Sequence, residues 1–314
     1  MHILLNMSGT LIGILLGSVL VFRLLRFFSD WSQRQVMQLL VLMTPLVNLI
    51  VLLGGLDHVL NPNCALNAPA WEALLDMSIL LLVGSSIVGA LGLGLGRLML
   101  MKRIMRQQEV IADPDLQALV DQLAQQRGLS RLCLQLVRSN RPFALLYGLR
   151  RPSLLLSTWM IGHLDRQELE AVLMHELVHA RRNDYLLNWG ALLLRDAFFY
   201  LPTSRIAYRQ LHYEKELACD ELVAQTTKRP LALASALTKV WLHGVDEPAS
   251  PMVQTLLGKG ELITDRLDRL LDIRSATLRK PPMRFASLRI GTSIGVILMN
   301  ITVSLALTVA LLHC

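Results

Sequence analysis

The sequence predicts a mainly α-helical membrane protein, with four transmembrane helices and a soluble α+β domain inserted between the third and the fourth. Three observations support this prediction. The chain of 314 residues is 53% hydrophobic, and its mean hydropathy of +0.45 is well above that of an ordinary soluble domain. Four apolar runs are each about long enough to cross a bilayer as a helix. Between the third and fourth runs lies a long region of amphipathic helical and strand-like patterns.

The four apolar runs define the predicted domains. They are Ile3–Phe22, Val36–Leu56, Met77–Leu100 and Ile290–Leu312. The resulting division is a three-helix transmembrane region at 1–101, a soluble domain at 102–286, and the fourth transmembrane helix at 287–314.

Basic residues predict how the chain is oriented in the bilayer. They cluster at Arg23–Arg34, Arg97–Arg106 and Arg279–Arg289, whereas Asp57–Asp76 contains no Lys or Arg and is expected to be an external loop. Cytoplasmic loops carry the excess of Lys and Arg. We therefore expect a multi-pass protein of the cell (inner or plasma) membrane, with residues 102–286 in the cytoplasm and both termini outside. Because the first run is followed rather than preceded by positive charge, it is expected to be an uncleaved anchor.

Composition also argues against two other classes. The net charge of +7 is explained by the clusters beside the apolar runs, and aromatic residues make up only 5% of the chain. We therefore expect a lipid bilayer as a partner and no direct nucleic-acid binding. The four cysteines show no C-x-x-C spacing, so neither a thiolate zinc site nor a disulfide framework is indicated.

The soluble region is predicted to combine helices with a small sheet. Strands are expected at 132–137, 142–148 and 152–157, and helices at 114–126, 165–182, 185–200, 205–226, 231–243 and 261–273. Gly128 is expected to end the first of these helices, as glycines do at the position after a helix. Two interpretations of the sheet stay open: it covers a helix, or one of its edge strands receives an extended substrate.

The strongest functional signal is the H-E-x-x-H motif at His175-Glu176-Leu177-Val178-His179. On a helix, residues four apart share a face, so both imidazoles can bind one metal ion while Glu176 reaches a water beside it. The flanking residues are apolar, and buried histidines need polar partners, which a metal ion provides. The motif therefore predicts a Zn²⁺ site, with Glu176 as the general base.

A third ligand is expected from a downstream acidic helix. A catalytic zinc site has three protein ligands and one open position. Glu216 and Asp220 are again four residues apart, so we expect Glu216 to be the ligand and Asp220 to orient His175 or His179. Glu214 is a rival ligand on roughly the opposite helix face, and only one of the two glutamates can bind.

Nearby residues have less specific interpretations. Cys219 is expected to be a small buried residue rather than a redox switch. Arg182 and Asp184 are expected to pair and to fix the end of the zinc helix. A donor is also needed for the oxyanion of a tetrahedral intermediate. The sequence does not choose among three candidates for it, which are Tyr208, His212 and Tyr213.

Taken together, these residues resemble the BlaR/MecR-type antirepressor family of integral-membrane zinc metallopeptidases, which are gluzincins with the pattern H-E-x-x-H…E-x-x-x-D. The resemblance is carried by 175–184, by 214–221, by Asn188 and Pro202, and by the strands around 142–152. It implies a cytosolic zincin-like metallopeptidase domain, with His175, His179 and Glu216 as zinc ligands. It also implies an endopeptidase that cleaves a protein or peptide substrate, such as a transcriptional repressor, in regulatory signalling.

One departure from that family and two alternatives complete the expectations. The chain ends at Cys314, without the external penicillin-binding sensor domain of the antibiotic-sensing members, so direct β-lactam sensing is not implied. The same zinc pattern is found in HtpX and CAAX-protease membrane peptidases, which act in quality control or processing. The other alternative is a non-catalytic membrane signalling scaffold, against which the intact Glu176 argues. The oligomeric state is not predicted.

Overall fold

The computed structural model describes residues 18–19, 31–54, 70–107, 110–126, 128–129, 132–147, 153–246 and 260–275. The chain divides into two compact units, the first formed by 1–98, 190–214 and 281–314, and the second by 99–189 and 215–280. The predicted spans Ile3–Phe22 and Ile290–Leu312 lie outside the described residues, apart from 18–19. The predicted division at residues 101 and 286 stays a prediction.

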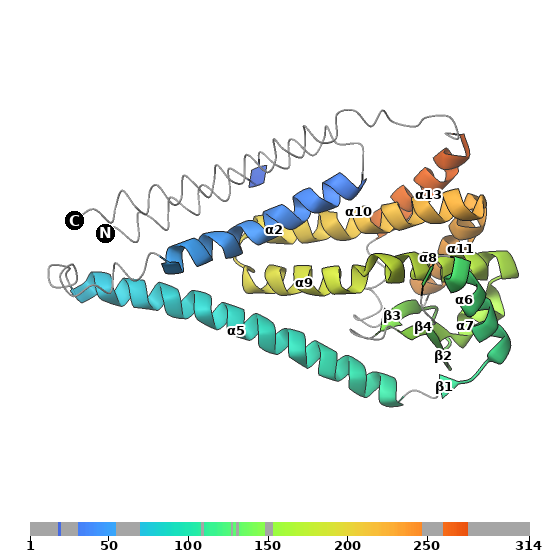
Figure 1. The fold of residues 1–314 in the computed structure, drawn as a ribbon, viewed down its shortest axis with the longest axis horizontal. Coiled ribbons are helices and arrows are strands. Elements are labelled where there is room, and N and C mark those ends of the chain that lie inside the picture. Colours follow the sequence, from blue (N-terminus) through green and yellow to red (C-terminus); the bar gives the residue numbers. More distant parts are fainter. Residues whose placement is uncertain are drawn as a thin grey trace. The chain divides into compact units, whose positions relative to one another are not determined.

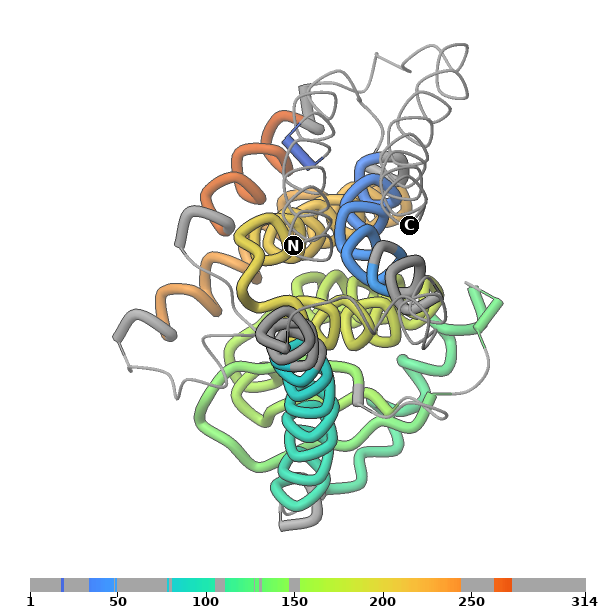
Figure 2. Tube along the Cα trace, turned by 90° about the vertical axis from the view of Figure 1, so that its left-hand side faces the viewer, coloured from blue at the N-terminus to red at the C-terminus, as the bar shows by residue number. Residues whose placement is uncertain are grey.

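The first unit contains two helices from the predicted transmembrane region. They are α2, Trp31–Gly54, and α5, Ala70–Gln107, of which residues 99–107 belong to the second unit. Figure 2 shows α5 as one continuous coil that is separate from α2. Among the residues that the structure describes, only the segment Leu81–Ile104 of α5 is long and apolar enough to cross a membrane. The four-helix topology therefore stays a prediction. Residues 70–76, the last part of the predicted external loop Asp57–Asp76, are helical and form the start of α5. Ala, Leu and Glu at these positions favour a helix.

The α9–α10 turn contacts α5 within the first unit. α9 comprises Asp184–Ala197, and α10 comprises Pro202–Thr227. The Ser86 hydroxyl of α5 donates a hydrogen bond to the Ala197 carbonyl at 3.0 Å, and Arg97 forms an ion pair with Asp196. Phe198 packs with Ala90 in a small apolar cluster. These contacts hold the segment 190–214 against α5.

The second unit contains a four-stranded mixed sheet. Its strands are β1 Val110–Ile111, β2 Cys133–Val137, β3 Ala144–Tyr147 and β4 Ser153–Ser157. Their order is β1-β2-β4-β3, with β2 parallel to β4 and the other two pairs antiparallel. The three predicted strands are confirmed. β1 was not predicted, because two residues are too few to show an alternating pattern.

Among the residues that the structure describes, five further helices belong entirely to the second unit. They are α6 Pro114–Gln126, α7 Thr158–His163, α8 Arg166–Arg182, α11 Pro230–Asp246 and α13 Gly260–Ser275. Gly128 follows α6 with a φ of 65°, the left-handed conformation expected at this helix end. The short α7 was not predicted, because its Thr and apolar residues continue the pattern of β4 without a turn signal.

α8 is the helix on which the site is built. Asp165 caps its first turn, and Asp165 and Glu168 form a reciprocal capping box, which satisfies backbone groups that a helix start leaves unpaired. Asn183 ends the helix in the left-handed conformation. The helix packs against β3 and α11 (Figure 1). Leu173 and Leu177 lie in the apolar core, each with 0% exposure, so α8 is held rigidly in place.

Candidate metal centre

Three predicted site residues converge in the second unit. His175 and His179 lie one turn apart on α8, and their Nε2 atoms are 3.0 Å from each other. Glu216 comes from α10, and its two carboxylate oxygens lie 3.4 Å from His175 Nε2 and 3.6 Å from His179 Nε2. One ligand atom from each residue lies within 4.8 Å of the others. Glu216 thus presents its donor atoms to the same point as the two histidines, although it lies 37 positions after His179 in the sequence.

The spacing of these atoms fits a metal ion. Three ligands at about 2.0–2.1 Å from a tetrahedral zinc ion lie about 3.3 Å from one another. The three distances of 3.0, 3.4 and 3.6 Å bracket this value. Two imidazole nitrogens that face each other at 3.0 Å repel through their lone pairs unless a cation or a proton lies between them. The donor set therefore suits a divalent cation that accepts nitrogen and oxygen ligands.

Each histidine is also held through its second ring nitrogen. Asp220 Oδ1 lies 3.0 Å from His175 Nδ1, and Asp184 Oδ2 lies 2.8 Å from His179 Nδ1. A carboxylate at Nδ1 favours the proton there, which leaves the Nε2 lone pair free for a metal. The sequence left open which histidine Asp220 contacts, and the structure places it on His175.

Asp184 has a larger role in this geometry than the sequence indicated. It lies 3.4 Å from Arg182 Nε, as the expected pair at the helix end. It also contacts His179, because Asn183, with a φ of 54°, turns the chain back toward the helix. One signal in the sequence could have indicated this contact. Asp184 directly follows Asn183, a residue type that often ends a helix in the left-handed conformation and so turns the next residue back toward the last helical turn.

Burial and charge shift the pKa values of the ligand group. Burial by itself would raise the pKa of Glu216, but the two histidines outweigh it and hold this pKa well below its usual range. Burial would lower the pKa of His175, but Asp220 and Glu216 raise it. In His179 burial is likewise outweighed, chiefly by Glu216, and the pKa lies well above its ordinary value. The site thus strongly favours positive charge between its carboxylates.

Glu176 faces a cavity beside the three ligand residues. The cavity has a volume of about 130 Å³. His175, Glu176 and Glu216 line it together with largely apolar side chains, among them Phe143, Met160, Val172, Leu233, Leu237 and Val240. Burial raises the pKa of the Glu176 carboxyl, although the neighbouring histidines oppose this shift. A carboxylate of raised basicity next to an apolar cavity suits a general base.

Arg266 is a site residue that the sequence did not single out. Its Nε and Nη2 donate to the two oxygens of Asp220 at 2.6 and 2.8 Å. The available signal is its position on α13: Ile263 and Leu270 are buried and Leu267 packs on the core, so Arg266 falls within the apolar stripe of the helix. A charged residue in such a stripe needs a buried partner.

The other predicted residues lie elsewhere or have indirect contacts. Cys219 is fully buried, as expected, with its Sγ 3.3 Å from His179 Nδ1. Glu214 is buried in the first unit, where its Oε1 lies 3.8 Å from Arg34, and it is absent from the group of ligand atoms. The three oxyanion candidates, Tyr208, His212 and Tyr213, all belong to the first unit.

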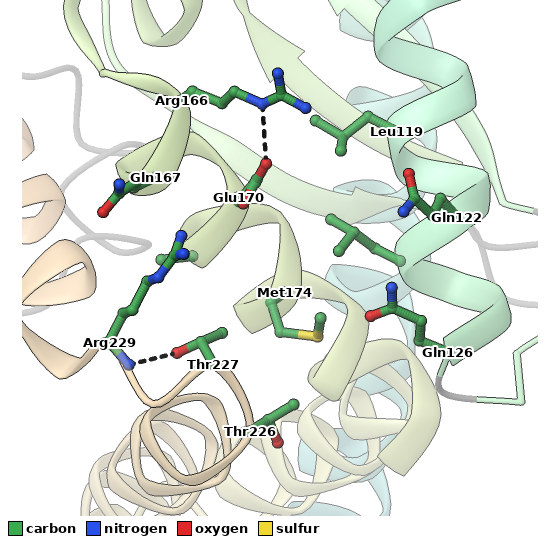
Figure 3. Close-up of a pocket in the computed structure, with 12 residues that line it drawn as sticks. Leu119, Gln122, Gln126, Arg166, Gln167, Glu170, Met174, Thr226, Thr227 and Arg229 are labelled. Atoms are coloured by element: carbon green, nitrogen blue, oxygen red, sulfur yellow. Dashed lines mark hydrogen bonds and ion pairs between the residues drawn. The ribbon is translucent and has the colours of Figure 1, made fainter.

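A second cavity lies on a different face of α8 (Figure 3). It has a volume of about 240 Å³ and is lined by polar residues such as Gln122, Gln126, Arg166 and Arg229, with Met174 among its apolar contacts. Among these lining residues, Arg166 donates a hydrogen bond to Glu170, one turn further along α8. The residues that line it, as the structure describes them, include none of the predicted site residues.

Comparisons with known proteins agree with this site. The BlaR1 peptidase M56 family matches residues 25–269. The regulatory protein BlaR1 of Bacillus licheniformis is 31% identical over 87 residues, which are 28% of this chain and 14% of that protein. Protease HtpX homologues of Acidiphilium cryptum and Acaryochloris marina are 26% and 24% identical over 46% and 56% of this chain, and 64% and 77% of their own. The chain thus spans less than two thirds of the first two relatives.

Proposed function

The chain belongs to the BlaR1 peptidase M56 family, and from this premise we propose that it is an integral-membrane zinc endopeptidase acting on the cytosolic side. The observation that carries the proposal is the convergence of His175, His179 and Glu216 on one point, with Glu176 beside them. The proposed reaction is hydrolysis of a peptide bond in a regulatory protein, such as a transcriptional repressor.

In this proposal, His175, His179 and Glu216 are the zinc ligands, and Asp220 and Asp184 fix the histidine rings. Zinc in such a site polarises a carbonyl and lowers the pKa of a bound water toward about 7. Glu176 accepts a proton from the attacking water as the new C–O bond forms. It then delivers this proton to the leaving amine as the C–N bond breaks.

The substrate is proposed to bind along β3. This strand is an edge of the sheet in the described part of the chain, and Ala144 at its start lines the same cavity as Glu176. We propose that an extended peptide pairs with the edge of β3 that no other described strand occupies, and places a side chain into the cavity. The apolar lining and the volume of about 130 Å³ favour an apolar side chain next to the cleaved bond.

The membrane arrangement is part of the proposal. Four spans would place residues 102–286 in the cytoplasm and both termini outside, following the distribution of Lys and Arg. Support comes from Leu81–Ile104, in which Leu81, Val88 and Leu91 are more than half exposed. Apolar side chains exposed along such a helix are suited to lipid contact.

A second candidate function is supported by the relatives. HtpX homologues match a larger share of this chain than BlaR1 does. The second candidate is therefore a quality-control or processing peptidase of the membrane, with the same metal centre and a broader range of substrates. The two candidates differ in the substrate, which is either one regulator or many membrane proteins.

Substrate trapping separates the candidates. The full chain with Glu176→Gln would be expressed in cells, cross-linked and purified, and its bound proteins identified by mass spectrometry. Enrichment of one soluble regulator that the wild-type protein cleaves supports the signalling role. Enrichment of many damaged membrane proteins supports the quality-control role. Binding of the same partner by wild type and variant, with no cleavage by either, would favour the non-catalytic scaffold.

A further inference from the structure

Arg266 of α13 is a buried cation surrounded by the acidic groups of the metal centre. Its side chain is 9% exposed, and it forms a two-pronged bond with Asp220 at 2.6 and 2.8 Å. Its Nη1 lies 3.4 Å from Oε2 of Glu216. A buried charge is strongly unfavourable unless it is paired and hydrogen-bonded, so these contacts fix where the guanidinium can lie.

Both carboxylates that Arg266 contacts also contact His175. Asp220 Oδ1 receives a bond from Arg266 and lies 3.0 Å from His175 Nδ1. Glu216 Oε2 lies 3.4 Å from Arg266 and 3.4 Å from His175 Nε2. Two of the three predicted ligands are thus linked to one guanidinium, one directly and one through Asp220.

The planar shape of the guanidinium matters for this arrangement. Its parallel N–H groups match the two oxygens of a carboxylate, whereas a lysine ammonium is a single point of charge. Without this fork, the Asp220 carboxylate could rotate and lose its position at His175 Nδ1. The Glu216 carboxylate would at the same time lose a cation that balances its charge.

We propose that Arg266 is a positioning residue of the metal centre, which holds Asp220 and Glu216 so that His175 and Glu216 present their donor atoms to one point. This inference rests on the proposed function. It adds a residue from α13, far from the H-E-x-x-H helix in sequence, to the parts that determine metal affinity and turnover.

The test measures zinc affinity of the full chain in detergent by competition with a chelator, and kcat and KM for a peptide substrate at saturating zinc. We expect Arg266→Met to weaken zinc binding about 10–100-fold, as loss of an outer partner of a ligand typically does. Arg266→Lys, which keeps the buried charge but not the fork, should also weaken it. At saturating zinc, kcat should fall while KM stays close to the wild-type value.

Two variants control for general loss of stability. Lys239→Met removes another ion pair in the same unit, 2.7 Å from Glu168, and should lower the melting temperature without changing zinc affinity. Arg269→Met alters an exposed arginine on α13 and should leave zinc affinity unchanged. If Lys239→Met weakens zinc binding as much as Arg266→Met, the effect is not one of positioning and the proposal fails.

A double-mutant comparison tests the route through Asp220. In the Asp220→Asn background, Arg266→Met should weaken zinc binding by a much smaller factor than in the wild type, because the two residues act together. The full factor in both backgrounds would overturn the proposal, as would wild-type zinc affinity in Arg266→Met and Arg266→Lys. If the wild type binds zinc and cleaves while these variants match it, only this inference falls. If the wild type binds no zinc, the proposed function falls with it.

Discussion

Oδ2 of Asp184 lies 2.8 Å from Nδ1 of His179, although Asp184 has already left the helix that carries the histidine. The left-handed conformation of Asn183 makes this contact possible, since it ends α8 and directs the next residue back to the last turn. The same turn begins α9 at Asp184. A helix end thus also orients a residue of the metal centre.

This contact predicts that Asp184→Asn weakens metal binding. Asparagine keeps the shape but removes the negative charge that favours a proton on Nδ1 of His179. We expect zinc affinity to fall about 10–100-fold, measured by competition with a chelator on the purified chain. Asp268→Asn, which alters an exposed acidic residue of α13, is the matched control. Unchanged affinity in Asp184→Asn would show that Asp184 only supports the helix end.

The two rival glutamates make a paired prediction. Glu216→Ala removes a proposed ligand and should cost several kcal/mol of the roughly 10–16 kcal/mol typical of a complete zinc site. Glu214→Ala alters a residue whose described partner is Arg34 and should leave zinc at one ion per chain. Metal analysis of both purified variants decides between them. Full zinc in Glu216→Ala with loss in Glu214→Ala would reverse the assignment.

The base is tested by separating metal binding from turnover. Glu176→Gln should retain zinc, because the ligands His175, His179 and Glu216 remain. Glutamine is close in shape but cannot accept a proton from water, so cleavage should fall at least about 10²–10⁴-fold. Zinc content and the rate of peptide cleavage are measured on the same preparation. Cleavage at the wild-type rate would exclude Glu176 as the base.

A buried network at the start of α8 predicts a pH dependence of stability. Burial would raise the pKa of Glu168, but its bonds to Lys239, Ser235 and the Asp165 backbone lower it below the ordinary value of 4.5. A carboxyl with a lowered pKa in the folded state stabilises the protein above its unfolded pKa, and this contribution is lost as the pH falls through the folded value.

We therefore expect the melting temperature to fall below about pH 4.5 more steeply in wild type than in Glu168→Gln. The variant should be less stable than wild type near neutral pH, where the contacts of Glu168 with Lys239 and Ser235 are intact. Thermal unfolding in detergent between pH 3 and 7 measures both. Parallel curves for the two proteins would show that Glu168 does not contribute to the acid transition.

The topology predicts opposite locations for two reporter fusions. A reporter at Asn67 should be active only in its external form, and one at Arg229 only in its cytoplasmic form, because Lys and Arg flank the spans on the cytoplasmic side. A cytoplasmic signal at Asn67 would contradict the proposed orientation. An external signal at Arg229 would instead place the metal centre outside the cell.

Much of the fold follows from local patterns in the sequence. The capping residues Asp165 and Glu168 mark the start of α8, and Gly128 marks the end of α6, because both signals act on backbone groups within a few residues. The strand predicted at 132–137 follows from period-two alternation, and those at 142–148 and 152–157 follow from short apolar runs on either side of the basic turn 149–151. The beginning of α5 at Ala70 and the short α7 differ from expectation, because nothing local opposes helix at 70–76 and nothing local ends the strand pattern at Ser157.

The sequence by itself determined that His175 and His179 share one helix face and that Glu216 and Asp220 share another, since residues four apart on a helix lie on the same face. Only the tertiary structure decided that Asp220 contacts His175, that Asp184 contacts His179 and that Arg266 joins them. Arg266 lies 46 residues beyond Asp220, and no periodic pattern relates positions on different helices. Packing of α13 against α11 brings the guanidinium of Arg266 to the carboxylate of Asp220, which lies on a different helix, α10.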